Sequence, residues 1–96
     1  MSLVEIVKEK REQILEVSER HGARNVRIFG SLARGEAGPA SDLDLLVDVG
    51  PDHTPWFPAG LIVDLEEMLG CEVDVITERS LKAHAREAIL RESRQL

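Results

Sequence analysis

The sequence predicts an α+β fold in which a small mixed sheet of three strands carries helices packed against it. Segments with helical apolar spacing alternate along the chain with short runs rich in Val, Ile and Leu. Glycine or proline stands at most of the boundaries between these segments. The chain has 96 residues, of which 43% are hydrophobic, so residues 1–96 are expected to form one domain around one core.

A first helix is predicted over residues 2–22. Ser2 and Glu5 stand three positions apart, which is the spacing of a capping box at a helix start. Gly22 is typical of the position just after a helix end. The apolar residues of this segment recur at helical spacing and are expected to face the core: Leu3, Ile6, Val7, Ile14 and Val17.

The middle of the chain predicts two strands separated by a loop. The first strand covers residues 26–29 and ends at Gly30 and Ser31. One helical turn is expected over residues 31–35, followed by a loop of small residues. The second strand covers residues 43–49 and is closed by a glycine and a proline.

The second half of the chain predicts a helix, a third strand and a C-terminal helical segment. The third strand covers residues 72–76. From Ser80 onward the sequence favours helix, with only a thin apolar stripe. The helix before the strand ends at Gly70, and its apolar residues are Leu61, Ile62, Leu65, Met68 and Leu69.

The composition weighs against several classes of partner. Twelve basic and 18 acidic residues give a net charge of −6, so direct binding to nucleic acid is not expected. No apolar stretch is long enough to cross a membrane. Cys71 is the only cysteine, so no internal disulfide can form and a cytoplasmic location is expected.

Three aspartates stand within or directly before predicted strands, where this residue is disfavoured. Asp42 and Asp44 are two positions apart, so their side chains share one face while the leucines between and after them take the other. Asp74 lies between two valines of the third strand. If the second and third strands pair with their apolar faces aligned, all three carboxylates lie on one side of the sheet.

Such a carboxylate cluster predicts a metal site. Two unit charges about 4 Å apart repel by about 4 kcal/mol at an effective dielectric near 20, so either one carboxyl is protonated or a cation lies among them. Mg²⁺ prefers oxygen ligands and leaves coordination positions for water and substrate phosphates. We therefore expect Asp42, Asp44 and Asp74 to bind Mg²⁺, and two such ions would suit an in-line displacement at phosphorus.

The turn after the first strand supplies groups that suit a phosphate. Gly30 lets the backbone approach a ligand closely, and Ser31 offers a hydroxyl and an N–H. Arg34 can add a charge-assisted contact. A phosphate site beside a metal site indicates transfer of a group from a nucleoside triphosphate.

These residues resemble a known family. Gly30-Ser31, ten further residues and then Asp42-x-Asp44 are similar to the signature of the DNA polymerase beta nucleotidyltransferase superfamily. The longer strings, Gly-Ser-x-Ala-Arg-Gly and Ser-Asp-x-Asp-Leu, most resemble its minimal nucleotidyltransferase (MNT) branch. The resemblance extends over nearly the whole chain and implies the nucleotidyltransferase fold.

The resemblance implies an activity, site roles and a partner. The activity is Mg²⁺-dependent transfer of AMP from ATP to an acceptor. Asp42 and Asp44 would bind the metal, and Asp74 would be the third carboxylate, which helps to activate the acceptor hydroxyl. Gly30 and Ser31 would hold the triphosphate, with Arg34 nearby. Family members of this size are commonly antitoxins that adenylylate a tyrosine of a helical HEPN-domain ribonuclease toxin, which would be the partner here.

Other interpretations of the same residues remain open. Asp42 could cap a strand end, Asp44 and Asp74 could be solvated edge-strand residues, and Arg34 could pair with Glu36 on the surface. Two other functions are also compatible with the sequence. One is a non-catalytic module that neutralises a partner protein by binding it, and the other is nucleotidyl transfer to a small molecule such as an aminoglycoside.

Overall fold

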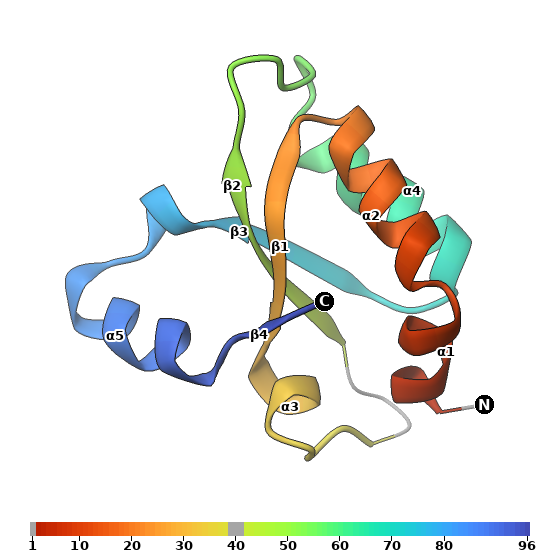
Figure 1. The fold of residues 1–96 in the computed structure, drawn as a ribbon, viewed down its shortest axis with the longest axis vertical. Coiled ribbons are helices and arrows are strands. Elements are labelled where there is room, and N and C mark those ends of the chain that lie inside the picture. Colours follow the sequence, from red (N-terminus) through yellow and green to blue (C-terminus); the bar gives the residue numbers. More distant parts are fainter. Residues whose placement is uncertain (1, 39–41) are drawn as a thin grey trace.

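Four strands form one mixed sheet, with helices lying on both sides of it (Figure 1). The structure is a computed structural model, and it describes residues 2–38 and 42–96. Met1 and residues 39–41 lie outside the described residues, and with them part of the predicted loop and Ser41 of the motif. The predicted α+β class is confirmed, but the predicted number of strands is wrong.

The sheet has the order β3-β2-β1-β4. Strands β1 (Ala23–Phe29) and β2 (Leu43–Val49) are antiparallel, and β3 (Val73–Thr77) runs parallel to β2. The unexpected fourth strand, β4 (Arg94–Gln95), pairs antiparallel with β1. Two polar residues are too short a run to give a strand pattern, so tertiary pairing alone makes this segment a strand.

The first predicted helix is two helices, α1 (Leu3–Glu9) and α2 (Arg11–Arg20), which meet at Lys10. The predicted cap is present, because the Ser2 hydroxyl accepts a hydrogen bond from the Glu5 N–H at 3.2 Å. Residues 8–13 are all charged or polar, so no apolar side chain fixes a continuous helix axis there.

The remaining helices follow the predicted order. The single turn α3 (Gly30–Ala33) begins directly after β1. Helix α4 (Ala59–Leu69) ends at Gly70, whose φ of 68° is the left-handed conformation expected of a C-terminal glycine. A short 3₁₀ helix, η1 (Glu78–Ser80), leads into α5 (Ala83–Glu92). No helix within the described ranges is both long and apolar enough to cross a membrane.

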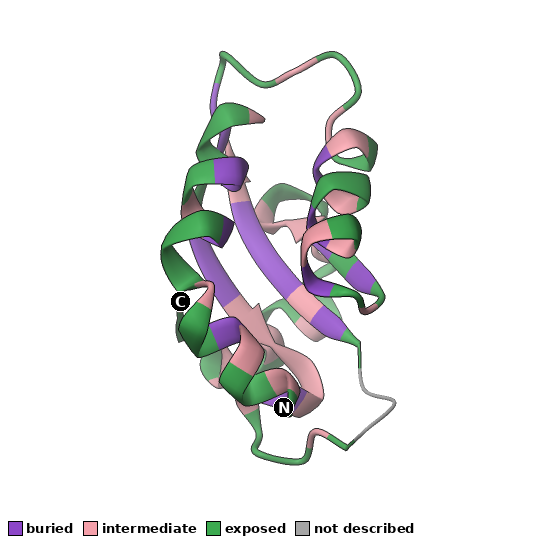
Figure 2. Cartoon of the chain, turned by 90° about the vertical axis from the view of Figure 1, so that its right-hand side faces the viewer, coloured by how far each residue is buried: buried purple, intermediate pink, exposed green. Residues whose placement is uncertain are grey.

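The core lies between the sheet and helices α2 and α4, which cover the same face (Figures 1 and 2). As predicted, every second residue of β2 from Leu43 to Val47 points into this core. The fully buried apolar side chains of this layer are Ile14, Leu43, Leu45, Val47, Leu61 and Leu65, while Leu46 is fully buried on the opposite face of β2. Each contributes about 1.5–3 kcal/mol of transfer free energy, so this layer fixes which face of each strand points inward.

The other face of the sheet carries a buried cation, Arg27, whose side chain is only 8% exposed. Its guanidinium contacts the Asp48 carboxylate at 2.9 Å and the Glu78 carboxylate at 3.4 Å. It also donates a hydrogen bond to the backbone oxygen of Asn25 at 2.9 Å. The desolvated charge therefore has three acceptors, as buried charges require.

We predict that Asp48→Ala lowers the free energy of unfolding by about 1–3 kcal/mol, because it leaves a buried guanidinium short of one hydrogen-bond acceptor. Asp52→Ala is the matched control. Asp52 pairs with Arg24 at 3.1 Å, but both side chains are more than half exposed, so a loss below about 0.5 kcal/mol is expected. Urea denaturation measures both values, and equal losses would contradict the importance given to the burial of Arg27.

Candidate active site

The pairing of β2 with β3 brings two aspartates together. The parallel register places Asp44 beside Asp74, with Leu43 beside Val73 before them and Leu45 beside Val75 after them. The aliphatic pairs are buried in the core, so the two carboxylates lie together on the opposite face. Neighbouring strands are about 4.8 Å apart, which sets the scale of this separation.

Gly30 lies against the Asp44 carboxylate. In the antiparallel pairing, Phe29 is opposite Asp44, and the chain then turns into α3 at Gly30 with a φ of +74°. A Cβ atom at position 30 would overlap the Oδ2 atom of Asp44. Glycine is required here both by the positive φ and by the lack of space for a side chain. The turn with Gly30 and Ser31 is thereby placed directly beside the paired aspartates.

The surroundings of Asp44 disfavour its negative charge. Partial burial is the largest cause that raises the pKa of this carboxyl above its ordinary value of 3.8. The charges of Asp74, Asp42 and Glu92 raise it further, while Arg34 opposes them. The site therefore holds several carboxylates whose mutual repulsion an added cation would relieve.

Arg34 and Gly30 share one partner that the sequence did not indicate. The guanidinium of Arg34 forms ion pairs with Glu36 at 3.0 Å and with Glu92 at 3.2 Å. The N–H of Gly30 donates a hydrogen bond to Oε1 of Glu92 at 2.9 Å. Hydrogen bonds to Glu36 and then to Glu92 raise the pKa of Arg34. The Glu92 carboxylate, at the end of α5, thus contacts both Gly30 and Arg34.

The oxygen donors of this site meet part of the coordination that Mg²⁺ needs. Across residues 2–38 and 42–96, no three His, Cys, Asp or Glu side chains are arranged as a ready metal site. Mg²⁺ usually takes one or two protein carboxylates and completes its shell with water and phosphate oxygens. Asp44 and Asp74 supply such a pair, and Asp42 is exposed just before β2. The residues present fit an ion of this kind that arrives with other ligands.

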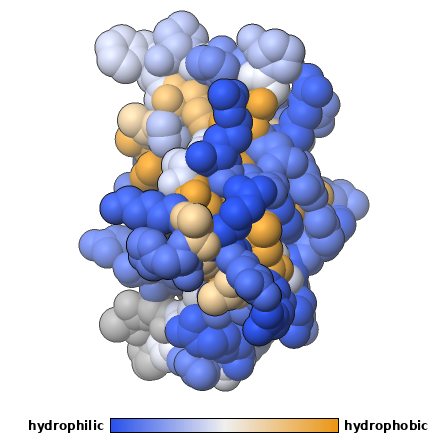
Figure 3. Space-filling model, turned by 90° about the vertical axis from the view of Figure 1, so that its left-hand side faces the viewer, coloured by the Kyte–Doolittle hydropathy of each residue, from blue (hydrophilic) through white to orange (hydrophobic). Residues whose placement is uncertain are grey.

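The side of the molecule on which α5 lies is mostly hydrophilic, with hydrophobic residues visible in its upper part and in a strip down its centre (Figure 3). A mostly polar surface suits a charged substrate better than an apolar ligand.

Comparison with known proteins agrees with this geometry. The profile of the nucleotidyltransferase domain matches residues 10–96. The chain belongs to the nucleotidyltransferase domain family. The resemblance inferred from the sequence, and with it the assignment to the nucleotidyltransferase class of enzymes, is confirmed.

Relatives of this nucleotidyltransferase domain have similar lengths. It is 39% identical over 79 residues to the protein adenylyltransferase MntA of Thermococcus cleftensis, covering 80% of this chain and 78% of that one. It is 37% identical over 87 residues to a chain of Methanocaldococcus jannaschii that is provisionally named a protein adenylyltransferase, covering 91% and 94%. A solved structure described as a minimal nucleotidyltransferase is 47% identical, with a TM-score of 0.86 and coverage of 100% and 97%.

A more distant similarity supports the fold alone. A toxin–antitoxin crystal structure with AMP-PNP matches this nucleotidyltransferase domain with a TM-score of 0.74 at 20% identity, covering 88% of this chain and 69% of that one.

The structure brings most of the predicted site residues of the nucleotidyltransferase motif to one place. Gly30, Arg34, Asp44 and Asp74 surround the start of α3, and the charge of Asp42 acts on Asp44. Ser31, the second residue of α3, is half-buried there. Their roles in binding and catalysis remain predictions. The sequence did not indicate Glu92 as a site residue. It lies 62 positions from Gly30 in the chain, and no local spacing predicts that contact.

We predict that Gly30→Ala costs more stability than Gly35→Ala. Both glycines have a positive φ, +74° and +73°, so both substitutions carry backbone strain of about 1–2 kcal/mol. Only at position 30 would the new methyl group overlap another group, the Asp44 carboxylate, whereas the space at Gly35 is open. Thermal unfolding would measure the difference, and equal losses would contradict the close packing of Gly30 on Asp44.

We also predict that Asp44→Asn stabilises the metal-free protein at neutral pH. A raised pKa means that the folded state disfavours the ionised form, so this carboxyl lowers stability as the pH rises above 3.8. The asparagine variant should match the wild type near pH 3 and exceed its melting temperature by up to about 4 °C at pH 7. Thermal melts in chelator-containing buffer test this, and a variant that is less stable at pH 7 would contradict it.

Proposed function

We propose that this chain transfers AMP from ATP to a hydroxyl of another protein in a Mg²⁺-dependent reaction, and that it acts as an antitoxin. The observation that carries the proposal is the in-register pair of Asp44 and Asp74 beside the turn at Gly30 and Ser31. This arrangement places a cation-binding acidic pair next to backbone and hydroxyl donors for phosphate.

Each residue has a separate task in this proposal. Asp42, Asp44 and Asp74 hold the metal, with two ions expected. Mg²⁺, when bound, supplies electrostatic stabilisation of the charge that develops on the phosphate oxygens. Gly30 and Ser31 hold the triphosphate, and Arg34 offers its guanidinium to a phosphate oxygen.

Asp74 has a further task at the acceptor. It is exposed on β3, so an incoming hydroxyl can reach it and pass its proton to it. The oxygen of that hydroxyl forms a bond to the α-phosphorus of ATP, the bond from that phosphorus to the bridging oxygen breaks, and pyrophosphate leaves.

The acceptor is proposed to be a protein. Relatives that are 37% and 39% identical over most of their length carry the name protein adenylyltransferase, and this supports a protein acceptor here. The 96 residues contain no tyrosine, so the proposed tyrosine acceptor lies outside them. The proposed acceptor is a HEPN-domain toxin, in line with the MntA–HepT toxin–antitoxin structure that shares this fold at 17% identity.

We predict that Asp42→Asn and Asp44→Asn each lower AMP transfer to a co-purified HEPN-domain protein by at least about 100-fold, because each removes a proposed metal ligand. Asp52→Asn is the control, since this aspartate is exposed and pairs with Arg24 away from the site. Transfer is followed with ATP labelled at the α-phosphate and by mass spectrometry of the acceptor protein.

The same experiment separates the proposal from its alternatives. Neutralisation of the toxin without covalent AMP would favour a non-catalytic binding module. Transfer to small hydroxyl compounds but not to the protein would favour a small-molecule enzyme. Wild-type rates in both aspartate variants would refute the catalytic assignment.

A further inference from the structure

Glu92 occupies two donors that the proposed function assigns to the nucleotide. It is the last residue of α5, and its Oε1 atom accepts the N–H of Gly30 at 2.9 Å. Its other oxygen, Oε2, lies 3.2 Å from Nη1 of Arg34. A backbone N–H beside a guanidinium is a combination that binds phosphate oxygens as well as carboxylate oxygens. The carboxylate therefore uses the same hydrogen-bond donors that a phosphate would need.

We propose that the Glu92 carboxylate is an internal competitor of the nucleotide phosphates, and that it must leave Gly30 and Arg34 before ATP binds fully. This inference rests on the proposed function, because it takes the turn at Gly30 as the phosphate site. It assigns Glu92 a role in setting the affinity for nucleotide, apart from the residues that carry out the reaction.

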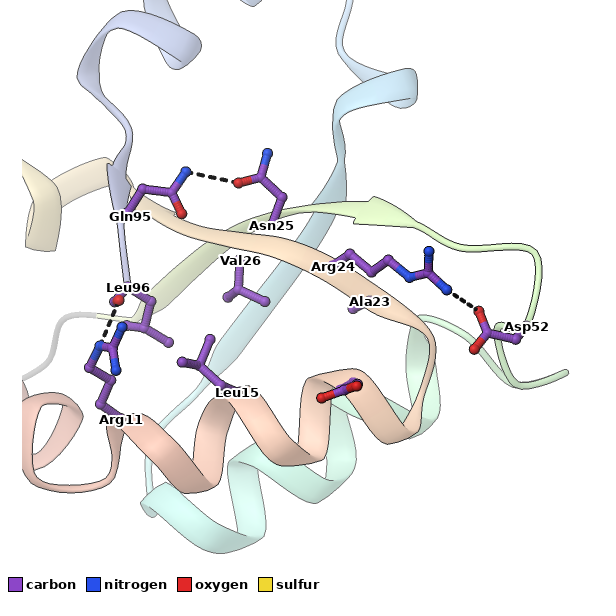
Figure 4. A pocket seen from close by; sticks show the side chains of 10 residues that line it. Arg11, Leu15, Ala23, Arg24, Asn25, Val26, Asp52, Gln95 and Leu96 are labelled. Atoms are coloured by element: carbon purple, nitrogen blue, oxygen red, sulfur yellow. Dashed lines mark hydrogen bonds and ion pairs between the residues drawn. The ribbon is translucent and has the colours of Figure 1, made fainter.

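The segment after Glu92 holds this contact in place. Strand β4 follows two residues later and pairs Gln95 with Arg27 of β1. Figure 4 shows two further anchors: the Gln95 amide donates to Oδ1 of Asn25 at 2.8 Å, and Arg11 donates to the backbone oxygen of Leu96 at 2.7 Å. These contacts keep Glu92 close to the turn, so it competes at a high effective concentration.

Helix α5, which precedes this contact, can move at little cost in free energy. None of the residues of α5 is buried, so moving this helix exposes little apolar surface. The contact is also opposed electrostatically, because the charge of Glu92 acts unfavourably on Asp44. A triphosphate with accompanying cations offers more charge to the same donors than one carboxylate does. The structure thus combines a tethered competitor with a loosely packed helix that can release it.

The test compares the affinity for Mg²⁺-ATP of the wild type with that of Glu92→Gln and Glu92→Ala. Removing the competing charge should lower Kd by about five- to twentyfold, the range expected for loss of one charge-assisted contact. Glu87→Gln is the matched control, because Glu87 lies on the same helix, is exposed and pairs only with Arg91 among the ion pairs of the described residues. Its Kd should equal that of the wild type. Titration calorimetry measures all four proteins, each checked for folding by its melting temperature.

Hydrogen–deuterium exchange supplies a second measurement. Mg²⁺-ATP should speed amide exchange in α5 of the wild type, because the helix loses its Glu92 contact when nucleotide binds. In Glu92→Ala, exchange in α5 should already be fast without nucleotide. Unchanged exchange in both comparisons would overturn the proposal.

The outcomes separate this inference from the proposed function. If the wild type and both Glu92 variants bind Mg²⁺-ATP with equal Kd, the inference is refuted and the proposed function stands. Weaker binding by the Glu92 variants also refutes it, and would make Glu92 part of the nucleotide site. If none of the four proteins binds Mg²⁺-ATP, the proposed function fails and the inference fails with it.

Discussion

The parallel register of β2 and β3 is the constraint on which the site depends. Like charges directly opposite each other on neighbouring strands are destabilising, yet Asp44 and Asp74 are paired in this way. The register persists because Leu43, Leu45, Val73 and Val75 lie on the reverse side in the core. Burial of each is worth about 1.5–3 kcal/mol, so the four together outweigh a repulsion of about 4 kcal/mol between two carboxylates at an effective dielectric near 20. A slip by one residue would exchange aspartates with aliphatic side chains across the sheet.

A second constraint connects this pair to the turn at Gly30 and Ser31. Strand β1 runs antiparallel to β2, so its end reaches the level of Asp44 just where Gly30 begins α3. The lack of a side chain at Gly30 lets the backbone and the carboxylate pack together. The Gly-Ser motif follows the end of β1 and the Asp-x-Asp motif stands at the start of β2, so the antiparallel pairing of these strands brings the two motifs together.

The sequence predicted those parts of the structure that follow from local periodicity. The bounds of β2 were predicted correctly at residues 43–49, because alternating leucine and aspartate leave one choice of inward face. Gly70 ends α4 as expected, since its left-handed conformation is a local property. The contact of Glu92 with Gly30 and the pairing of β4 with β1 could not be predicted. Both contacts depend on the direction that the chain takes through α5 after it leaves β3. No periodic pattern in the sequence indicates either contact.

In the proposed function, the charge balance of the site requires nucleotide and metal to bind together. Four carboxylates act on this region, those of Asp42, Asp44, Asp74 and Glu92, and Arg34 is the one cation that acts on Asp44 among the described residues. Arg34 is moreover engaged by two glutamates. A triphosphate approaching this surface alone meets net negative charge and is repelled. Cations bound to the triphosphate reverse the sign of its interaction with the aspartates. The aspartates then attract the metal-bound triphosphate, whereas they repel the free one. In the proposed function, the acidity of the site would thus select a metal-bound nucleotide over a free one.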